Sequence, residues 1–347
     1  MRPLNVRVVT YNVLSSRLAH PQQFPSLNPE HLDAANRLPV VLEKLEEEIA
    51  QKSIICLQEV SHEWAGSFHT LFANRGYHLV TGLYGKKFNG YMGVAVAWPT
   101  SSLDVLDVDV SRLSDKRDGG WPVAPQEEAL DKIWNGISAF VRSPLERLGL
   151  LESPPIDPWS YSENRFNILL TVKLKDKDSG LPFCLGCYHM PCAFYAPMVM
   201  TIHAEMAAYH VQTLAGEVPY ILAGDWNIKP NLSHYKLLTS GIMDRGDPSF
   251  PTPKFQMEWK SRAKPMKSAY AESDHGEPDF TNYARVKDEE PFIDTLDYIF
   301  CDQRWEVVSV KKLPKREESG GPFPNLDVGE PSDHILIAAD LRFEGTH

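Results

Sequence analysis

The feature that most constrains the fold of this chain is a long series of short apolar runs, several of which have polar side chains at their ends. Short runs rich in β-branched and apolar residues predict strands. Such runs occupy residues 5–14, 53–60, 91–98, 166–174, 182–190, 219–224, 295–301, 305–310 and 334–341. Many strands with only a few helices favour two packed sheets flanked by helices.

One predicted helix lies between the first two strands. Residues 36–51 carry apolar side chains at near-helical spacing, as expected of a helix that covers one face of a sheet. Four glutamates, Glu48 among them, are available for the opposite face of this helix. The first 60 residues therefore predict a strand, helix, strand unit.

Length and composition favour a single domain. With 347 residues, 43% of them apolar and 10% aromatic, the chain can bury one large core, so we expect one domain over residues 1–347. Residues 99–163 differ, because they hold Gly119 and Gly120, several prolines and a predicted helix from Gln126 to Trp134. We expect an irregular, proline-containing excursion there, which is either a lid over a site or an inert surface loop.

The chain has no stretch of 18 apolar residues and no apolar signal-peptide core near its first residue. We expect an unexported, intracellular protein, in the cytoplasm and without a membrane partner. Five cysteines, an odd number, fit a reducing compartment. Cys184 and Cys187 form a Cys-x-x-Cys, but no second pair at zinc-ribbon spacing accompanies them, so no structural zinc site is predicted.

The charge balance limits the partners. A formal net charge of −11 argues against a broad basic surface that grips long nucleic acid, so any phosphate contact must be local. Two local basic clusters exist, at 254–267 and 311–316. The second fits a solvated surface. The first interleaves with Phe255, Trp259, Tyr270 and Phe280, which either stack on nucleobases or pack the edge of a sheet.

Several polar residues at strand ends have the chemistry that phosphoester hydrolysis needs. That reaction requires a hard cation, a positioned water and donors for the developing charge on the phosphoryl oxygens. Oxygen ligands from Asp, Glu and Asn suit Mg²⁺, with Mn²⁺ as a substitute. Such residues stand at four strand ends: Asn12, Glu59, Asp225 with Asn227, and Asp333 with His334. Strand ends hold side chains rigidly at the rim of a core.

Each of these residues alone is weak evidence, because a lone Glu after a strand is usually a solvated loop residue. The combination carries the prediction. Gly224-Asp225-Trp226-Asn227 places two oxygen donors two residues apart on one side of an extended segment, after a glycine that permits a sharp turn. Ser332-Asp333-His334 sets a carboxylate beside an imidazole that can donate to a phosphate oxygen.

In this order and at this wide spacing, these segments resemble the motifs of the endonuclease/exonuclease/phosphatase superfamily. The resemblance covers Val8 to about Leu341, on the segments Thr10–Leu14, Leu57–Val60, Gly224–Asn227, Thr295–Phe300 and Pro331–His334. Within the superfamily they look closest to the branch of carbon catabolite repressor-type deadenylases, nocturnin, Angel proteins and 2′-phosphodiesterases. Lys267–Tyr270 and Phe280–Tyr283 are further resemblances to that branch.

The resemblance implies a four-layer α/β sandwich of two packed mixed sheets flanked by helices, with the site at one edge. It implies Glu59 as the principal Mg²⁺ ligand, with Asn12 and Asp333 nearby. Asp225 would orient or deprotonate the attacking water, with Asn227 beside it. The phosphoryl group would be bound by His334, held by Asp297, and by His189 from the other side. It further implies substrate contacts from Lys267, Tyr270, Phe280 and Asn282.

Substrate choice stays open between two enzymatic classes. The first is a 3′-exoribonuclease or phosphodiesterase that releases nucleoside monophosphates from RNA, such as poly(A) or 2′,5′-linked oligoadenylate. The second is a phosphatase acting on a small nucleotide, a dinucleotide cofactor or another phosphorylated metabolite. The chain leaves the family pattern at Cys187 and after His189, where substrate is expected to be chosen. A catalytically dead binding scaffold is disfavoured, because every motif carboxylate is present. Because the match begins so near the first residue, we expect no leucine-rich-repeat docking region.

Overall fold

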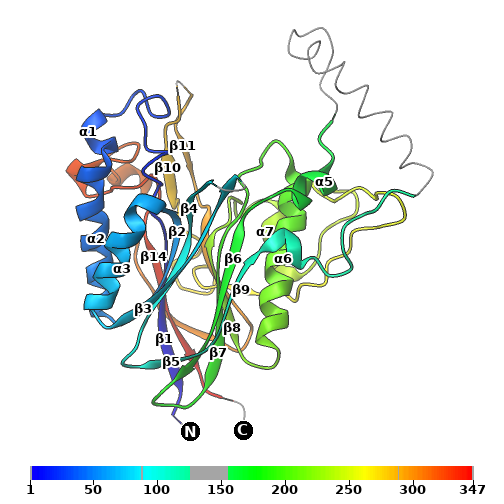
Figure 1. The fold of residues 1–347 in the computed structure, drawn as a ribbon, viewed down its shortest axis with the longest axis horizontal. Coiled ribbons are helices and arrows are strands. Elements are labelled where there is room, and N and C mark those ends of the chain that lie inside the picture. The colour runs from blue at the N-terminus through cyan, green and yellow to red at the C-terminus, as the bar shows by residue number, and fades with distance from the viewer. Residues whose placement is uncertain (1, 87–88, 126–154, 288, 346–347) are drawn as a thin grey trace.

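The computed structural model describes residues 2–86, 89–125, 155–287 and 289–345, and two six-stranded sheets face each other at its centre (Figure 1). The first sheet has the order β13 (Glu306–Val310), β14 (Ile337–Phe343), β1 (Leu4–Asn12), β2 (Ile54–Ser61), β4 (Asn89–Pro99), β3 (Tyr77–Lys86). The second has the order β5 (Leu103–Arg112), β6 (Ile168–Asp176), β7 (Pro182–His189), β8 (Tyr220–Asp225), β12 (Asp297–Cys301), β9 (Lys267–Ser268). Strands β10 (Asn282–Ala284) and β11 (Phe292–Asp294) form a small separate ribbon.

Helices cover the outer faces of both sheets, which gives four layers (Figure 1). On the first sheet lie α1 (Pro29–Leu32), α2 (Ala34–Ala50) and α3 (His62–Asn74). On the second lie α5 (Pro158–Glu163), α6 (Pro197–Ala215) and α7 (Ser233–Ser240). Short 3₁₀ turns are found at η1 (Leu113–Lys116), η2 (Arg316–Glu318) and η3 (Leu326–Val328). The predicted α/β fold of two packed mixed sheets flanked by helices is confirmed.

The inner faces of the two sheets form one apolar core, and a further core lies under each helical layer. Val8 and Ile54 from the first sheet and Leu170, Leu185 and Ile221 from the second are fully or almost fully buried in the central cluster. Strands that are buried on both faces read as continuous apolar runs. That property is why the sequence predicted β1, β2, β7 and β8 so directly.

The central strands of the two sheets share one pattern. In the first sheet β1 is parallel to β2 and antiparallel to β14, and β4 is antiparallel to β2. In the second, β8 is parallel to β7 and antiparallel to β12, and β6 is antiparallel to β7. The carboxyl ends of β1, β2, β7 and β8 and the amino ends of β12 and β14 therefore meet at the edge opposite the chain termini (Figure 1).

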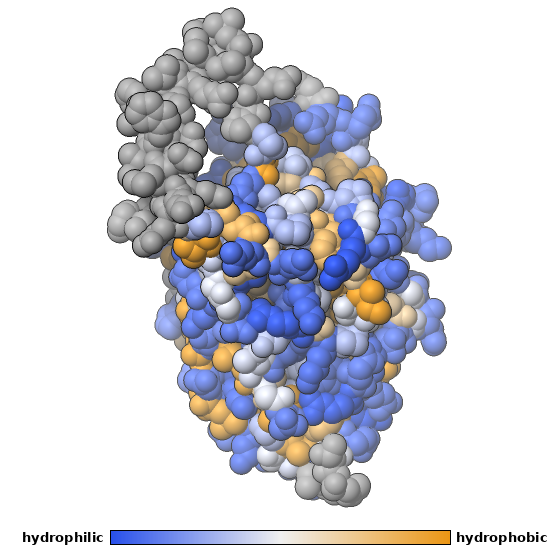
Figure 2. Space-filling view, turned by 90° about the vertical axis from the view of Figure 1, so that its right-hand side faces the viewer, coloured by the Kyte–Doolittle hydropathy of each residue, from blue (hydrophilic) through white to orange (hydrophobic). Residues whose placement is uncertain are grey.

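The expected excursion at 99–163 is only partly irregular. Leu103–Arg112 forms β5, an edge strand paired over its length with β6, and Pro158–Glu163 forms α5. The predicted helix from Gln126 to Trp134 lies outside the described residues. The face around α6 is largely hydrophilic with small apolar groups (Figure 2). Within the described ranges, no helix has the length and apolarity needed to cross a membrane.

Glu48 corrects the prediction for the first helix, because it lies on the buried face of α2 and not on the solvent face. Its carboxylate accepts hydrogen bonds from Arg7 Nε at 2.9 Å, Ser53 Oγ at 3.1 Å and Lys311 Nζ at 3.0 Å. Lys311, expected to be surface charge, thus contacts a buried carboxylate. Burial alone would raise the pKa of Glu48, but the bonds from Arg7 and Lys311 outweigh that effect and lower it.

Replacing Glu48 with Ala should lower the free energy of unfolding by about 3 kcal/mol, because Arg7 and Lys311 each lose a partner within a partly buried network, in which Arg7 keeps only Asp340 among the described residues. A carboxyl whose folded pKa is lowered stabilises the fold above its unfolded pKa, and that contribution is lost as the pH falls through the folded pKa. The difference between wild type and variant should therefore shrink below about pH 4. Urea unfolding at several pH values measures this, and Glu47→Ala, at an exposed neighbour, should have little effect.

Candidate active site

The eight polar residues predicted for the site, six from strand ends and two from the family resemblance, lie at one edge of the two sheets. Asn12, His189 and Asp225 are the last residues of β1, β7 and β8, and Glu59 is the third-last residue of β2. Asp297 is the first residue of β12, opposite Asp225 in the ladder. Three more positions adjoin these strands: Asn227 follows β8, and Asp333 and His334 precede β14. All eight side chains are buried or half-buried.

Glu59 is aimed into this edge by an irregularity in its strand. The pairing of β2 with β4 shifts register between Leu57 and Val60, and Glu59 itself has a φ of +58°. A non-glycine residue in the left-handed region is costly and persists where the surroundings enforce it. Its carboxylate accepts from Ser15 N at 2.9 Å, which fixes one oxygen. The bulge thus turns the side chain of Glu59 toward this edge of the sheets.

Gly224 is required by close packing before Asp225. Its φ is +154°, and a Cβ at this position would lie 1.8 Å from the carbonyl oxygen of Tyr188. No side chain fits at such a distance. The close approach of β7 and β8 brings His189 into register with Asp225, with His189 Nε2 3.4 Å from Asp225 Oδ2.

Asn12 joins the two sheets across this edge. Its Nδ2 donates to Glu59 Oε1 at 3.2 Å and to Asp225 Oδ2 at 3.0 Å, so one amide contacts a carboxylate from each sheet. Its Oδ1 accepts from Leu14 N at 3.0 Å, which fixes the orientation of the amide. Asn227 is held similarly, with its N donating to Asp225 Oδ1 at 3.0 Å and its Nδ2 to Met190 O at 3.0 Å.

His334 and Asp297 form a buried ion pair. His334 Nδ1 donates to Asp297 Oδ2 at 2.7 Å, and Thr281 Oγ donates to the same oxygen at 2.6 Å. Burial would lower the pKa of His334, but the Asp297 and Asp225 carboxylates outweigh burial and raise it well above its usual value. The imidazole is therefore charged at neutral pH, with Nε2 directed toward Asp225 at 3.7 Å and free to donate to an anion.

His189 is held from two sides. Its Nδ1 is hydrogen-bonded to the hydroxyl of Tyr84, and its carbonyl accepts from Asn167 Nδ2 at 2.8 Å. Burial raises the pKa of Tyr84, so the phenol keeps its proton and can donate. Donation from Tyr84 to Nδ1 leaves the proton of a neutral ring on Nε2, the atom that faces Asp225.

The loop that carries Asp333 and His334 is fixed to the loop after β1 by a buried arginine. The guanidinium of Arg37 on α2 donates from Nη2 to the carbonyls of Val13 at 2.7 Å and Leu14 at 2.6 Å, and from Nε to Pro331 O. Ser332 Oγ adds a bond to Asn12 O at 2.7 Å. Arg37 thus donates hydrogen bonds to carbonyl oxygens of both loops and fixes the distance between the loops.

The donor set suits a divalent cation. Four buried or half-buried carboxylates, from Glu59, Asp225, Asp297 and Asp333, face one charged imidazole. Burial, with help from the neighbouring Glu59 and Asp225 carboxylates, raises the pKa of Asp333 to about 6. An excess of buried negative charge is unfavourable without a counter-ion, and oxygen ligands of this type are those of Mg²⁺ and Mn²⁺.

One subset within this group has ligand atoms that all lie within 4.8 Å of one another, from Asp225, Asp297 and His334. The ion pair explains this closeness. A protonated imidazole that donates through Nδ1 to Asp297 has no free lone pair for a metal. Glu59 and Asp333 accept no hydrogen bond from a charged side chain of the described residues, so their carboxylates are the better ligands for a metal ion.

Six of these side chains form the floor of a cavity of about 870 Å³, namely those of Glu59, His189, Asp225, Asn227, Asp333 and His334. Asn12 and Asp297 are buried and support the floor through the hydrogen bonds described above. Apolar and aromatic residues make most of its walls: Leu14, Leu18, Phe24, Tyr91, Met92, Phe166, Met190, Pro191, Phe194, Ala284, Val286, Phe292 and Leu296. The phenyl groups of Phe194 and Phe292 contact each other with ring centroids 6.3 Å apart. A volume of this size accommodates a ligand larger than a single phosphate.

Comparison with known proteins identifies the family. The model of the Endonuclease/Exonuclease/phosphatase family matches residues 9–334, nearly the whole chain. The chain belongs to this family. Its members act on phosphate esters, and the matched range contains every residue of the floor described above.

The relatives agree with the predicted branch. The chain is 27% identical over 204 residues to mouse 2′,5′-phosphodiesterase 12, which covers 56% of the chain and 32% of that relative. It is 21% identical over 345 residues to nocturnin of Drosophila melanogaster, which covers 97% of the chain and 47% of the relative. The chain thus spans about a third to a half of the length of these relatives.

Solved structures of this family share the fold. ANGEL2, described as a 2′,3′-cyclic phosphatase and solved with adenosine-2′,3′-vanadate, superimposes with a TM-score of 0.70 over 99% of the chain and 97% of its own, at 17% identity. The human nocturnin catalytic domain with a bound sulfate gives 0.60 over 98% and 93%, at 19% identity. At such identities the likeness concerns the fold alone.

The predicted substrate contacts need correction. Of the four residues, Asn282 lines the cavity, where it pairs with His334 through a backbone bridge. Lys267 Nζ instead bonds the carbonyl of Trp305, and Tyr270 donates to Lys311 O at 2.8 Å. Phe280 is fully buried and packs against Phe323. These three side chains do not line the cavity, so we assign them to the framework of the fold.

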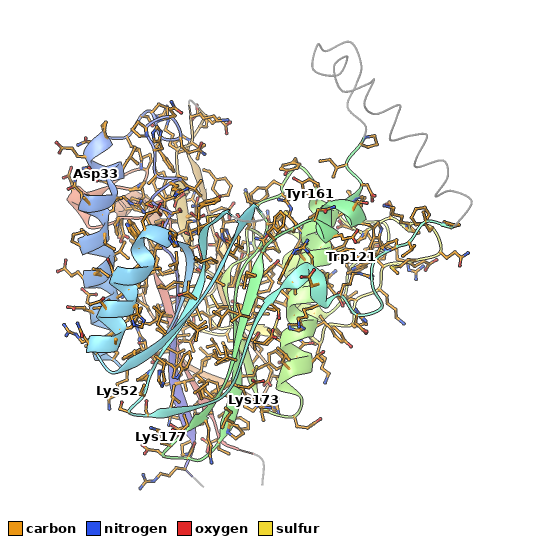
Figure 3. The ribbon with its side chains drawn as sticks, in the orientation of Figure 1. Asp33, Lys52, Trp121, Tyr161, Lys173 and Lys177 are labelled. Carbon is orange, nitrogen blue, oxygen red and sulfur yellow. The ribbon has the colours of Figure 1, made fainter. Side chains whose placement is uncertain are left out.

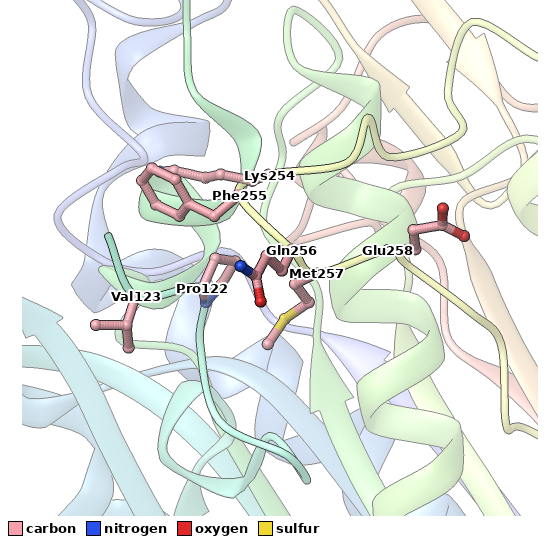
Figure 4. Close-up of a pocket in the computed structure, with 7 residues that line it drawn as sticks. All are labelled: Pro122, Val123, Lys254, Phe255, Gln256, Met257 and Glu258. Atoms are coloured by element: carbon pink, nitrogen blue, oxygen red, sulfur yellow. The ribbon is translucent and has the colours of Figure 1, made fainter. Parts of the chain in front are cut away.

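The first basic and aromatic cluster also lies apart from the floor. Lys254, Phe255 and Met257 line a separate shallow cavity of about 410 Å³ together with Pro122 and Val123 (Figure 4). Lys254 pairs with Asp157, and Trp259 is buried against Phe250. The reading of this cluster as a wall that packs the sheet edge fits these contacts better than base stacking.

Sequence reasoning missed two residues that position the site, Arg37 and Tyr84. Arg37 had a detectable signal, since it falls in phase with Val41 and Leu45 on the buried stripe of α2. A charged residue in phase with an apolar stripe indicates a buried partner. Tyr84 had none, because β3 (Tyr77–Lys86) was not predicted and its pairing with β4 joins positions that the local pattern does not link.

Replacing Asp297 with Asn should lower the pKa of His334 in Mg²⁺-free protein, because the strongest interaction that opposes the effect of burial is removed. A histidine whose folded pKa is raised loses its charge only as the pH rises through that pKa. The wild-type ring should thus stay charged to higher pH than the variant ring. An NMR titration in EDTA measures both, with Asp302→Asn, at the other end of β12, as the control. An unchanged His334 pKa would contradict the ion pair.

Proposed function

We propose that this chain is a Mg²⁺-dependent phosphodiesterase that removes nucleoside monophosphates from the 3′ end of RNA or of a short oligoribonucleotide. The observation that carries the proposal is the floor of the cavity. There, two histidine Nε2 atoms from opposite sides, His189 and His334, approach one carboxylate, Asp225, beside a second group of carboxylates around Glu59. Donors for a phosphoryl group and ligands for a cation thus share one small space.

The residues divide into roles that follow from their contacts. His334, charged by Asp297, donates to a non-bridging phosphoryl oxygen, and His189 donates to another from the opposite side. Charged and neutral donors placed where negative charge develops stabilise the transition state. Asp225 accepts a proton from the attacking water, with Asn227 holding one of its oxygens. Asn12 keeps Asp225 and Glu59 at a fixed separation.

Glu59, with Asn12 and Asp333 close by, would hold the Mg²⁺. When bound, the ion neutralises charge on the phosphoryl oxygens and on the leaving oxygen. The raised pKa of Asp333 supports a cation here, because the unbalanced carboxylates around it already favour protonation. Mn²⁺ has similar ligand preferences and should substitute.

The walls of the cavity support a nucleotide over a sugar phosphate. Phe166, Phe194 and Phe292 line it, and the first two are 37% and 43% exposed. Exposed aromatic faces beside a phosphate site stack on nucleobases with little preference for sequence. The ammonium group of Lys229 lies 4.8 Å from the ring centroid of Phe292 and fixes that ring.

Glu59→Ala should remove essentially all release of AMP from a labelled oligoadenylate in the presence of Mg²⁺. Loss of a principal ligand removes the charge that the ion supplies, which is worth several kcal/mol. Glu63→Ala changes an exposed carboxylate four residues further along the chain, at the start of α3, and should retain activity. Calorimetric titration with Mg²⁺ completes the test, since wild type should bind at millimolar concentration and Glu59→Ala should not. An active Glu59→Ala enzyme would refute the mechanism.

The alternative is a phosphatase on a small nucleotide or dinucleotide. It is favoured by the lining of the cavity, which holds a single Lys or Arg among the described residues and so offers few contacts to the phosphates of a long polymer. A panel of 3′,5′- and 2′,5′-linked oligoadenylates, dinucleotides and sugar phosphates separates the two. Activity confined to monoesters would favour the alternative.

A further inference from the structure

One cation stands on the wall of the active-site cavity, away from the residues of the floor. Arg165 follows α5 and precedes β6, and it is the lone Lys or Arg among the described residues that line this cavity. Two residues later, Asn167 bonds the carbonyl of His189, which ties the arginine's segment to the catalytic strand β7. Arg165 therefore has a fixed position relative to the site.

The guanidinium of Arg165 is held in place but has unused hydrogen-bonding capacity. Its Cζ lies 4.1 Å from the centre of the Tyr161 ring, and its Nη2 has one long bond of 3.4 Å to the hydroxyl of Tyr195. Its Nε is buried without a hydrogen-bond partner, and no ion pair to it is found within the described ranges. A guanidinium has five donors, which are normally satisfied when it is half-buried.

Its neighbour Arg112 shows the contrast. Arg112 bonds Arg165 O at 2.8 Å, Asp115 Oδ1 at 2.8 Å and the carbonyl of Glu163, so all three of its nitrogens have partners. These two neighbouring arginines thus differ in state, because the protein satisfies Arg112, which does not line the active-site cavity, and leaves Arg165 with unused donors. Tyr161, which stacks on the unsatisfied one, lies at the end of the molecule opposite Lys173 and Lys177, where the site also lies (Figure 3).

Most of the charged side chains that line the cavity are acidic, so Arg165 is a distinct site of positive charge on its wall. Glu289 and Glu290 make part of the wall acidic, and Glu59, Asp225 and Asp333 line the floor. An anion entering this cavity meets favourable charge at the two histidines with the bound cation, and again at Arg165. A cavity with two separate anion positions suits a substrate with two phosphates, and the acidic wall disfavours a third.

We propose that Arg165 binds a second phosphate of the substrate, one nucleotide to the 5′ side of the phosphodiester that is cleaved. This proposal rests on the proposed function and narrows it to substrates with a terminal dinucleotide unit. Arginine recognises phosphate through paired, charge-assisted hydrogen bonds, which its unused nitrogens can supply. Tyr161 orients the guanidinium by stacking on it.

The test compares two substrates that differ by one phosphate, the dinucleotide ApA and its 5′-phosphorylated form pApA. Wild type should cleave pApA with a kcat/KM about ten-fold or more above that for ApA. Arg165→Gln should reduce this ratio to about one while its rate on ApA stays within about two-fold. Arg165→Lys, which keeps the charge without the fork, should retain part of the preference.

Controls distinguish a phosphate contact from a damaged wall. Arg75→Gln removes an equal charge from an exposed pair with Glu46, outside the cavity, and should leave the ratio unchanged. Equal loss by Arg165→Gln on both substrates, with an unchanged melting temperature, would overturn the proposal. So would a wild type that treats the two substrates alike.

Binding separates this proposal from the proposed function. Calorimetry in EDTA, where no hydrolysis occurs, should give tighter binding of pApA than of ApA to wild type, and equal binding to Arg165→Gln. That result combined with no hydrolysis would reject the proposed function and keep the phosphate site. If Arg165→Gln weakened binding only of a 5′,5′-linked dinucleoside diphosphate, and not of pApA, the proposal that Arg165 binds a phosphate of an oligonucleotide would be overturned.

Discussion

The side-chain amide of Asn12 is the interaction on which the site depends. It donates to Glu59 within its own sheet and to Asp225 on the facing sheet, so two carboxylates that would repel each other are held at a fixed separation. A hydrogen bond to a charged group contributes about 1.5–3 kcal/mol, and two such bonds from one amide offset part of the repulsion. An aspartate here would add a third negative charge, and a leucine would remove the hydrogen bonds to both carboxylates.

The rest of the edge can be understood as the support of this arrangement. Arg37 donates hydrogen bonds to the carbonyls of the loop that follows Asn12 and of the loop that carries Asp333 and His334. Asp297 charges His334, the one group on the floor whose positive charge partly balances the carboxylates. The balance is incomplete, because four carboxylates face one imidazolium. The same excess of negative charge that raises the pKa of Asp333 favours binding of a divalent cation at the floor.

The sequence predicted the floor better than the walls, for a physical reason. Strands buried on both faces leave a continuous apolar signal, and a polar residue at the end of such a run stands out. The walls come from loops and from pairings between distant positions, which leave no local pattern. Lys267, Tyr270 and Phe280 were predicted as substrate contacts from their motif, yet a motif does not tell which face of a segment a side chain occupies. Glu48 and Arg37 were detectable only by their phase on α2.

Edge strands show the same limit. β5 alternates acidic and valine residues and exposes Val105, Val108 and Val110, so it lacks the continuous apolar run of the central strands. Its partner β6 supplies the burial that makes it a strand, and that partner is more than 50 residues away along the chain on average. Proline and glycine that follow it therefore dominated the prediction of an irregular excursion.

The division between floor and walls also bears on how substrate choice arises. Both sheets contribute to the floor through the same pattern of parallel and antiparallel strands, so a change in one strand end disturbs the metal and phosphate chemistry as a whole. Arg165 and Phe194 lie on segments between strands, and Phe292 begins the short strand β11 outside the two main sheets, while all three line the cavity. Residues placed in this way can change the ligand without changing the reaction. We therefore expect the walls, where Arg165 keeps unused donors, to set the choice of substrate.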